Sequence, residues 1–215
     1  MMLLLLRNFL FILILSALLC ACSSPDEAEA LYSEGLKHFS TKDLARAEEL
    51  FSAAYEKDGG HLNALLMLSK ISYYNRDYAA GIERADALLK KSPMHSGALY
   101  WKARCVIMSD PDKSGEAMVL LQRSLESDSG NLQARQLLGL VCERGGMYRE
   151  ALHHYFEALK EEETLVNVRV NLALLYDRMG LKERGTSEIE RALQIARAAG
   201  IPEKNILTIK GDMKK

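Results

Sequence analysis

One segment of the chain has the donor spacing of a calcium-binding loop. Asp110, Asp112 and Ser114 place oxygen atoms at loop positions 1, 3 and 5, and Gly115 stands at position 6, where such a loop needs a sharp turn. Position 12, which requires a bidentate glutamate, is Leu121. The segment is therefore better interpreted as a two-residue insertion between two helices, and no metal is expected there.

Two adjacent histidines are the other candidate for metal chemistry. His153 and His154 stand four and three residues before Glu157, a spacing that lets an imidazole and a carboxylate share one helix face. One such pair is too few ligands for a metal site, and adjacent side chains on a helix point in different directions. These residues are expected to lie on a solvated face.

Motifs of catalysis are missing from the sequence. His38, His61 and His95 have no carboxylate or cysteine arranged to make a catalytic base. The chain contains no phosphate-binding glycine loop, nucleophile elbow or zinc-protease motif. We therefore expect no enzyme activity, no catalytic residues and no cofactor.

Residues 1–21 form a hydrophobic leader. Only Arg7, Asn8 and Ser16 among them fall outside the hydrophobic class, and a positively charged start before an apolar stretch is typical of a secretory signal peptide. Leu19 stands three residues before Cys22, and an alanine directly precedes that cysteine. This arrangement resembles a bacterial lipobox. The resemblance implies that Cys22 becomes the acylated first residue of the mature protein.

Acylation would fix the protein to a membrane. Each buried methylene of a palmitate-like chain contributes about 0.8 kcal/mol, so a multiply acylated cysteine is a lasting anchor. A cleaved signal without lipid and an uncleaved anchor are the alternatives, although the apolar core is shorter than the roughly 20 residues of a spanning helix. The expected location is the bacterial envelope, facing the periplasm, with the inner or outer membrane left open.

Composition narrows the fold class. The 215 residues are 48% hydrophobic and 27% charged, with a net charge of −1, which excludes a disordered chain and a basic nucleic-acid binder. Few valines and threonines accompany the abundant Leu, Ala, Glu, Lys and Arg, so helix is favoured over sheet. Cys105 and Cys142 are predicted to be buried free thiols, because packed helices seldom bring two Cα atoms into disulfide range.

A repeat runs through the body of the chain. Small residues recur with spacings of 34, 36, 34 and 34, and the residue four positions later is usually large and apolar, which marks one packed helix face. The small residues are Ala47, Gly81, Ala117, Ala151 and Gly185, and the residues four positions later are Phe51, Ala85, Leu121, Tyr155 and Ile189. This pattern resembles the tetratricopeptide repeat, a 34-residue helix-turn-helix unit. The predicted fold is all-α, a right-handed α-solenoid of about five such units preceded by a signal peptide.

The register divides the chain into a leader, a tether, five repeats and an end segment. Residues 22–27 form the tether, residues 28–199 the array, and residues 200–215 a segment expected to cap the stack, because a solenoid needs a covered end. The repeats are one (28–61), two (62–95), three (96–131), four (132–165) and five (166–199).

Members of the resembled family bind partners in a concave groove lined by the first helix of each repeat. The resemblance assigns to this groove, in repeats two and three, Asn63, Leu66, Met67, Lys70, Tyr73, Tyr74, Tyr100, Trp101, Arg104, Ile107 and Met108. In repeats four and five it assigns Gln133, Gln136, Leu137, Leu140, Glu143, Arg144, Asn167, Val170, Asn171, Leu174, Asp177 and Arg178. Aromatic and arginine side chains dominate binding hot spots, so repeats two and three are predicted to make the main contact, with Lys70 and Arg104 meeting carboxylates. Several of the aromatics could instead pack between repeats.

The resemblance implies a membrane-anchored extracytoplasmic scaffold that recruits protein or peptide partners in the bacterial envelope. The alternative is a ligand-binding repeat protein associated with a solute-binding protein or transporter, which would need an enclosed apolar pocket. Nucleic acid is not an expected partner. The sequence leaves the partner and the oligomeric state open.

Overall fold

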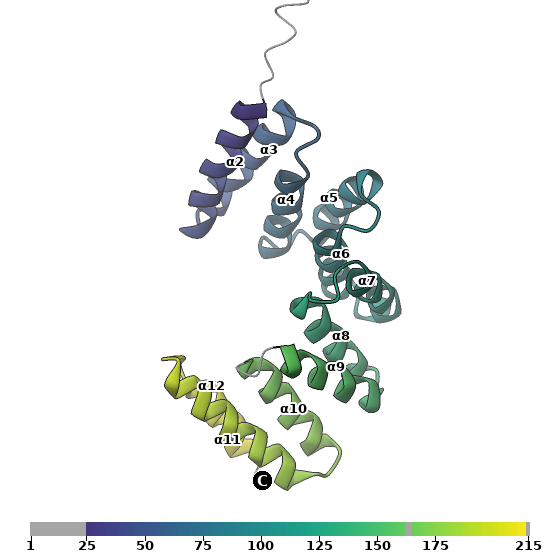
Figure 1. Cartoon of the computed structure of the whole chain (residues 1–215), viewed down its shortest axis with the longest axis vertical. Coiled ribbons are helices and arrows are strands. Elements are labelled where there is room, and N and C mark those ends of the chain that lie inside the picture. The colour runs from purple at the N-terminus through teal and green to yellow at the C-terminus, as the bar shows by residue number, and fades with distance from the viewer. Residues whose placement is uncertain (1–24, 162–164, 214–215) are drawn as a thin grey trace, which may run out of the picture. The chain divides into compact units, whose positions relative to one another are not determined.

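The computed structural model describes residues 25–161 and 165–213 of the chain (Figure 1). Within these ranges it forms eleven α-helices and one short 3-10 helix, with no strand. The leader predicted for residues 1–21 and the predicted lipidation site at Cys22 lie outside the described residues. Every helix in the described ranges is too short or too polar to cross a membrane.

The helices belong to two compact parts, one ending at Lys91 and the other beginning at Ser92. The N-terminal part contains α2 (Pro25–Ser40), α3 (Leu44–Lys57), α4 (Leu62–Tyr74) and α5 (Tyr78–Lys91). The C-terminal part contains α6 (Ser96–Ser109), the 3-10 helix η1 (Pro111–Lys113), α7 (Ser114–Ser127), α8 (Leu132–Arg144), α9 (Tyr148–Glu161), α10 (Val166–Arg178), α11 (Lys182–Ala198) and α12 (Lys204–Asp212).

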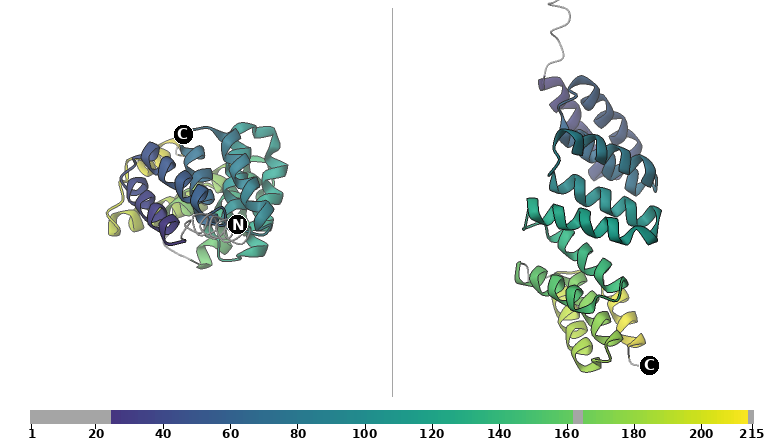
Figure 2. Two further views of the ribbon diagram at one scale, coloured as in Figure 1. Left: turned by 90° about the horizontal axis from the view of Figure 1, so that it is seen from above. Right: turned by 90° about the vertical axis from the view of Figure 1, so that its right-hand side faces the viewer.

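Consecutive helices pair as antiparallel hairpins, which Figure 2 shows from two further sides. The pairs are α2 with α3, α4 with α5, α6 with α7, α8 with α9, and α10 with α11. Within each part, the second helix of one hairpin also packs on the first helix of the next. The predicted all-helical fold of helix-turn-helix units is therefore confirmed. Helices α4, α6, α8 and α10 begin at the residues assigned to the starts of repeats two to five.

Side-chain caps explain why several of these helices begin where they do. The Nδ1 atoms of His61 and His95 accept the backbone N–H groups of Ala64 and Ala98, at 3.1 and 3.2 Å. Asn131 caps α8 in the same way. Each cap pairs an N–H group that a helix end would otherwise leave without a partner. The two histidines therefore have a structural task that the sequence analysis did not assign.

The turn inside a hairpin needs one residue in the left-handed region. Gly146 and Gly180 supply it in repeats four and five, with φ of 75° at both. Repeats one and two place Lys42 (φ 65°) and Arg76 (φ 62°) at the equivalent positions, one repeat length apart. A residue with a β-carbon is strained in this conformation. Repeat three differs because its two extra residues form η1.

Polar contacts, most of them partly buried, connect the helices of the N-terminal part. The Arg84 guanidinium donates to Glu48 Oε1 and to Ser72 Oγ, both at 2.6 Å, and to the Leu68 carbonyl at 3.1 Å. Ser69 Oγ donates to the Gly81 carbonyl at 2.8 Å. The first set links α3, α4 and α5. Ser72 occupies a position where an aromatic is common in the repeat, and here it meets the arginine instead.

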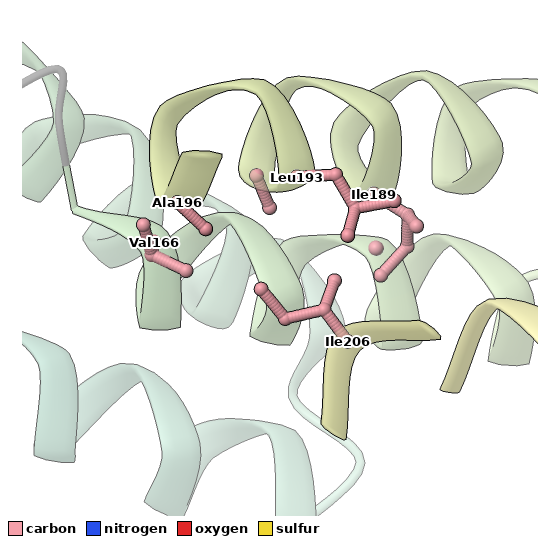
Figure 3. Packing of buried hydrophobic residues seen from close by; sticks show 7 residues of the cluster. Val166, Ile189, Leu193, Ala196 and Ile206 are labelled. Atoms are coloured by element: carbon pink, nitrogen blue, oxygen red, sulfur yellow. The ribbon is translucent and has the colours of Figure 1, made fainter. Parts of the chain in front are cut away.

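Helix α12 covers the last hairpin of the C-terminal part. Ile206 is buried in a cluster with residues of α10 and α11, and Figure 3 shows its side chain pointing toward the helix that carries Ile189 and Leu193. A β-carbon on Gly185 would lie 2.8 Å from Met213 Cε. The cluster consists of Val166, Ala173, Ile189, Ala192, Leu193, Ala196 and Ile206. The segment predicted to cap the stack therefore packs against its final hairpin.

Candidate functional site

The first helices of repeats three, four and five line a cavity of about 200 Å³ in the C-terminal part. All of its lining residues stand at positions that the repeat register assigns to the binding groove. They are Tyr100 and Arg104 of α6, Gln133, Gln136, Leu137 and Leu140 of α8, and Asn171 of α10. Helices α6, α8 and α10 thus bring together side chains from three repeats that are far apart in the sequence.

Two aromatic rings hold the Arg104 side chain. Its Nη1 donates to the Tyr100 hydroxyl at 3.3 Å, and its guanidinium carbon lies 4.8 Å from the centre of the Trp101 ring and 5.7 Å from that of Tyr100. Tyr100 and Trp101 are each only 8% exposed. Cation–π contacts of this kind favour one orientation of the arginine. Trp101, predicted as a groove residue, therefore supports Arg104 and is not among the residues that line the cavity.

The lining combines three kinds of side chain. Gln133, Gln136 and Asn171 carry amides, Leu137 supplies an apolar wall, and Arg104 carries the positive charge. Among the described residues that line this cavity there is no carboxylate. Amide side chains can donate to and accept from a peptide backbone, and arginine pairs with carboxylates through two parallel hydrogen bonds. The cavity is therefore chemically suited to an extended peptide with an acidic side chain.

A second aromatic group lies in the N-terminal part. The Lys70 ammonium lies 4.8 Å from the centre of the Phe39 ring, and the Phe39 and Tyr74 ring centres are 6.1 Å apart. Tyr73 contacts both Tyr74 and Tyr78, with 5.8 Å between ring centres in each pair. The structure thus brings Lys70, Tyr73 and Tyr74 together. Phe39 stands one repeat length before Tyr73, so the repeat register contained this signal although the sequence analysis missed it.

The remaining predicted groove residues have different surroundings. Met67 is 9% exposed and belongs to the core of the N-terminal part. Asn63 is exposed near the start of α4, and Met108 is 49% exposed near the end of α6. Glu143, also at a groove position, is only 4% exposed. The groove positions of the register therefore include core residues as well as accessible ones.

Glu143 belongs to a buried polar network. Its Oε2 accepts the Tyr155 hydroxyl at 2.8 Å, and its Oε1 pairs with Arg178 Nη1 at 2.8 Å. Burial raises the pKa of the Tyr155 hydroxyl well above its ordinary value, and the hydrogen bond and the negative charge of Glu143 add to the effect. The network links α8, α9 and α10. Its role is to fix these helices beside the cavity.

The segment that begins at Asp110 and the histidine pair His153–His154 were the candidates for metal chemistry. Asp110 Oδ1 accepts the Asp112 N–H at 3.0 Å and so shapes the turn at η1. Burial, followed by the charges of His153 and Arg135, lowers the pKa of His154, whose Nδ1 is buried without a hydrogen-bond partner. No cluster of three or more potential metal ligands occurs in residues 25–161 and 165–213.

Cys105 and Cys142 are free and buried, as predicted. Cys105 lies on α6 and Cys142 on α8. Burial, together with the charge of Glu150, raises the pKa of the Cys142 thiol. A raised pKa keeps a thiol protonated and unreactive.

Sequence comparison relates the chain to repeat proteins. A tetratricopeptide repeat model matches residues 13–61 and 66–109. The auxiliary subunit NAA15 of the N-terminal acetyltransferase A complex of Arabidopsis thaliana is 31% identical over 108 residues. That match covers 50% of this chain, and the chain spans only 12% of the length of the plant subunit.

Solved structures share the fold. A thermophilic TPR protein of Thermus thermophilus is similar with a TM-score of 0.71 and 17% identity, over 86% of this chain and 98% of that one. MamA has a TM-score of 0.65 and 20% identity, over 77% and 96%. YrrB, described as a TPR protein with an unusual peptide-binding site, has a TM-score of 0.60 and 17% identity, over 84% and 90%. Proteins of this fold mediate protein–protein interactions and typically serve as non-catalytic scaffolds. The repeat register, the helical hairpins and both comparisons agree, and together they support assignment of the chain to the tetratricopeptide repeat proteins.

Proposed function

We propose that this chain is a scaffold that binds an extended segment of a protein partner in the groove of α6, α8 and α10. The observation that carries the proposal is the cavity lined entirely by groove positions of three successive repeats. Each of the three helices contributes at least one polar side chain that can form a hydrogen bond with such a segment. This places the main contact in repeats three to five, whereas the sequence analysis favoured repeats two and three.

Each lining group has a distinct task in this proposal. Arg104, held by Tyr100 and Trp101, pairs with a carboxylate of the partner. Gln136 and Asn171 exchange hydrogen bonds with its backbone, and apolar side chains of the partner pack on the leucines of α8. Because the arginine is already oriented, little side-chain entropy is lost on binding.

We further propose that the scaffold is a lipoprotein of the bacterial envelope, anchored through Cys22 and facing the periplasm. Support comes from the apolar leader and from the lipobox-like sequence that ends at this cysteine. Acyl chains on this cysteine would hold the repeats close to the membrane, because α2 begins at Pro25, within the segment 22–27 that was predicted to be a tether. Partner capture would then take place close to the membrane surface.

The groove is tested by affinity capture from detergent-solubilised envelope with matched double variants. Gln133→Ala with Gln136→Ala removes two amides from the cavity lining, whereas Gln122→Ala with Asn205→Ala removes two exposed amides from α7 and α12. The groove variant should lose the captured partner and the control should keep it. Equal capture by both folded variants would rule out the groove as the binding site.

The anchor is tested by mass spectrometry of the mature N-terminus and by membrane fractionation. Cys22→Ser should abolish acylation and release the protein from the membrane fraction. Cys20→Ser is the control, since it changes the neighbouring cysteine and leaves the proposed acylation site intact. An unmodified residue 22 in the parent chain would contradict the proposal.

A further inference from the structure

A cavity of about 550 Å³ lies beside the turn between α2 and α3. Its lining comes entirely from the N-terminal part and is mainly apolar: Phe39, Ser40, Lys42, Leu44 and Tyr74. Small-molecule sites typically have volumes of about 300–1,000 Å³ and combine apolar walls with a few polar groups. The volume of this half-open cavity lies within that range, and its lining residues are separate from those of the groove of α6, α8 and α10.

Two aromatic rings from different helices form the walls. Phe39 of α2 and Tyr74 of α4 have ring centres 6.1 Å apart and planes inclined by 45°. Tyr73 contacts Tyr74 in a T-shaped arrangement, with ring centres 5.8 Å apart and planes inclined by 76°. Tyr74 is 47% exposed and Phe39 is partly buried. Rings at this separation touch each other, so an apolar ligand can pack on their exposed surfaces but not between them.

The charged residue in the lining of the cavity is a lysine. Lys42 is part of the lining, and the Lys70 ammonium lies 4.8 Å from the centre of the Phe39 ring. The nearest acidic side chain in sequence is engaged elsewhere: Asp43 accepts the Arg46 N–H at 3.3 Å through Oδ1 and pairs with His38 Nδ1 at 3.0 Å through Oδ2. A ligand with an anionic group therefore complements this site.

Lys42 also has an unusual backbone conformation. Lys42 has a φ of 65°, a conformation that costs a residue with a β-carbon roughly 1–2 kcal/mol. Glycine occupies the equivalent turn position in repeats four and five. Arg76 has the same conformation in repeat two, so what distinguishes Lys42 is its place in the lining of the cavity.

We propose that this cavity binds a small amphipathic acid, with an aromatic or branched apolar body and one carboxylate. The apolar body lies against Phe39, Leu44 and Tyr74. The carboxylate faces the ammonium group of Lys42. This binding site is independent of the peptide groove, so the chain combines a protein-binding surface with a small-ligand site.

The test uses indole-3-propionate and its uncharged amide as a matched pair of probes. Isothermal titration of the full chain in a nonionic detergent should give one molecule of the acid bound per chain, about tenfold tighter than the amide, because a nearby ammonium attracts only the acid. Equal affinities for acid and amide, or no binding of either at millimolar concentration, would overturn the proposal.

Two glycine variants test whether the carboxylate of the ligand contacts the ammonium group of Lys42. Lys42→Gly removes the ammonium and suits the left-handed turn, so this chain should fold. Arg76→Gly makes the same change at the equivalent turn of repeat two, outside the cavity lining. Lys42→Gly should reduce the affinity for the acid to that for the amide, and Arg76→Gly should leave both unchanged. An identical effect of the two variants would show that the acid responds only to overall charge.

A third comparison separates this site from the groove. Tyr74→Leu removes an aromatic wall and should weaken the acid and the amide alike. The groove variant Gln133→Ala with Gln136→Ala should leave both affinities unchanged. Loss of acid binding in the groove variant would mean that the probe occupies the groove, and the proposal would fail while the peptide function stood.

Discussion

Gly139 lies so close to Tyr155 that a β-carbon on residue 139 would stand 2.6 Å from Cε1 of the tyrosine ring. The same relationship recurs in repeat one, where a β-carbon on Gly35 would stand 2.7 Å from Phe51 Cε1. In both repeats an aromatic ring of the second helix packs directly on the backbone of the first. The small and large residues of the repeat pattern are therefore packing partners across a hairpin.

Substituting Gly139 with alanine should destabilise the fold. Alanine is favoured over glycine inside a helix by about 1 kcal/mol, but the added methyl group would push against the fully buried Tyr155 ring. Overpacking of this kind typically costs about 1–3 kcal/mol, so a net loss is expected. The free energy of unfolding measured with urea checks this.

Gly115→Ala is the control for that prediction. Gly115 lies in the first turn of α7, and a β-carbon there would meet nothing within 4 Å. This variant should be as stable as the parent or gain a few tenths of a kcal/mol from helix propensity. If both alanine variants gained stability, the close approach of Gly139 to Tyr155 would not limit packing.

Alkaline solution should destabilise the protein through Tyr155. Because burial and the bond to Glu143 raise the pKa of this hydroxyl, the unfolded chain loses the proton above about pH 10 while the folded chain keeps it. Stability then falls by up to about 1.4 kcal/mol per pH unit for this group. Tyr155→Phe should be less stable at pH 8, where Glu143 loses a partner, but its stability should fall less steeply between pH 10 and 11. Urea titrations of both proteins at these pH values give the free energies of unfolding. If the free energy fell equally with pH in both proteins, the prediction would be contradicted.

Acid solution should destabilise the protein through His154. Burial lowers the pKa of this imidazole in the folded chain, so below about pH 6.5 the unfolded chain binds a proton that the folded chain does not. Stability is therefore lost as the pH falls. His154→Leu should reduce that loss, and thermal melts at pH 8 and pH 5 would show it. His153→Leu, at the exposed neighbour, should give a smaller rescue, because it removes a charge that only adds to the effect of burial. A rescue as large as that of His154→Leu would count against the prediction.

Relieving backbone strain should stabilise the N-terminal part. Lys42 and Arg76 adopt the left-handed conformation with φ of 65° and 62°, which costs roughly 1–2 kcal/mol relative to glycine, offset by about 0.5–1 kcal/mol of extra chain entropy. Lys42→Gly and Arg76→Gly should each raise the free energy of unfolding by about 0.5–1 kcal/mol. Lys37→Gly, inside the exposed face of α2, should lower it. A loss of stability in both turn variants would show that the side chains contribute more than the strain costs.

The helical hairpins were predictable because the sequence is periodic. The regular repeat spacing located the hairpins because small residues must recur wherever helices approach closely. The same spacing relates His61 to His95, and both cap helices, yet histidine is an uncommon cap residue and its role was missed. Which residue caps a helix depends on local geometry that composition does not show.

The candidate site was predictable only in part. The register identified every lining residue of the C-terminal cavity, from Tyr100 to Asn171. It could not separate accessible positions from buried ones: Glu143 stands at a groove position but bonds to Tyr155 inside the protein. Contacts between side chains of different helices depend on rotamers and helix crossing angles, which a linear pattern does not contain.

Helix α12 has a consequence for assembly. Its Ile206 occupies the apolar seam of the last hairpin, where the first helix of a further repeat or of a second molecule would otherwise pack. Since α12 belongs to the same chain, it competes for this seam at the high effective concentration of a tethered segment. End-to-end polymerisation through this face would require α12 to be displaced. The helix therefore opposes association of further repeats or molecules at this end of the array.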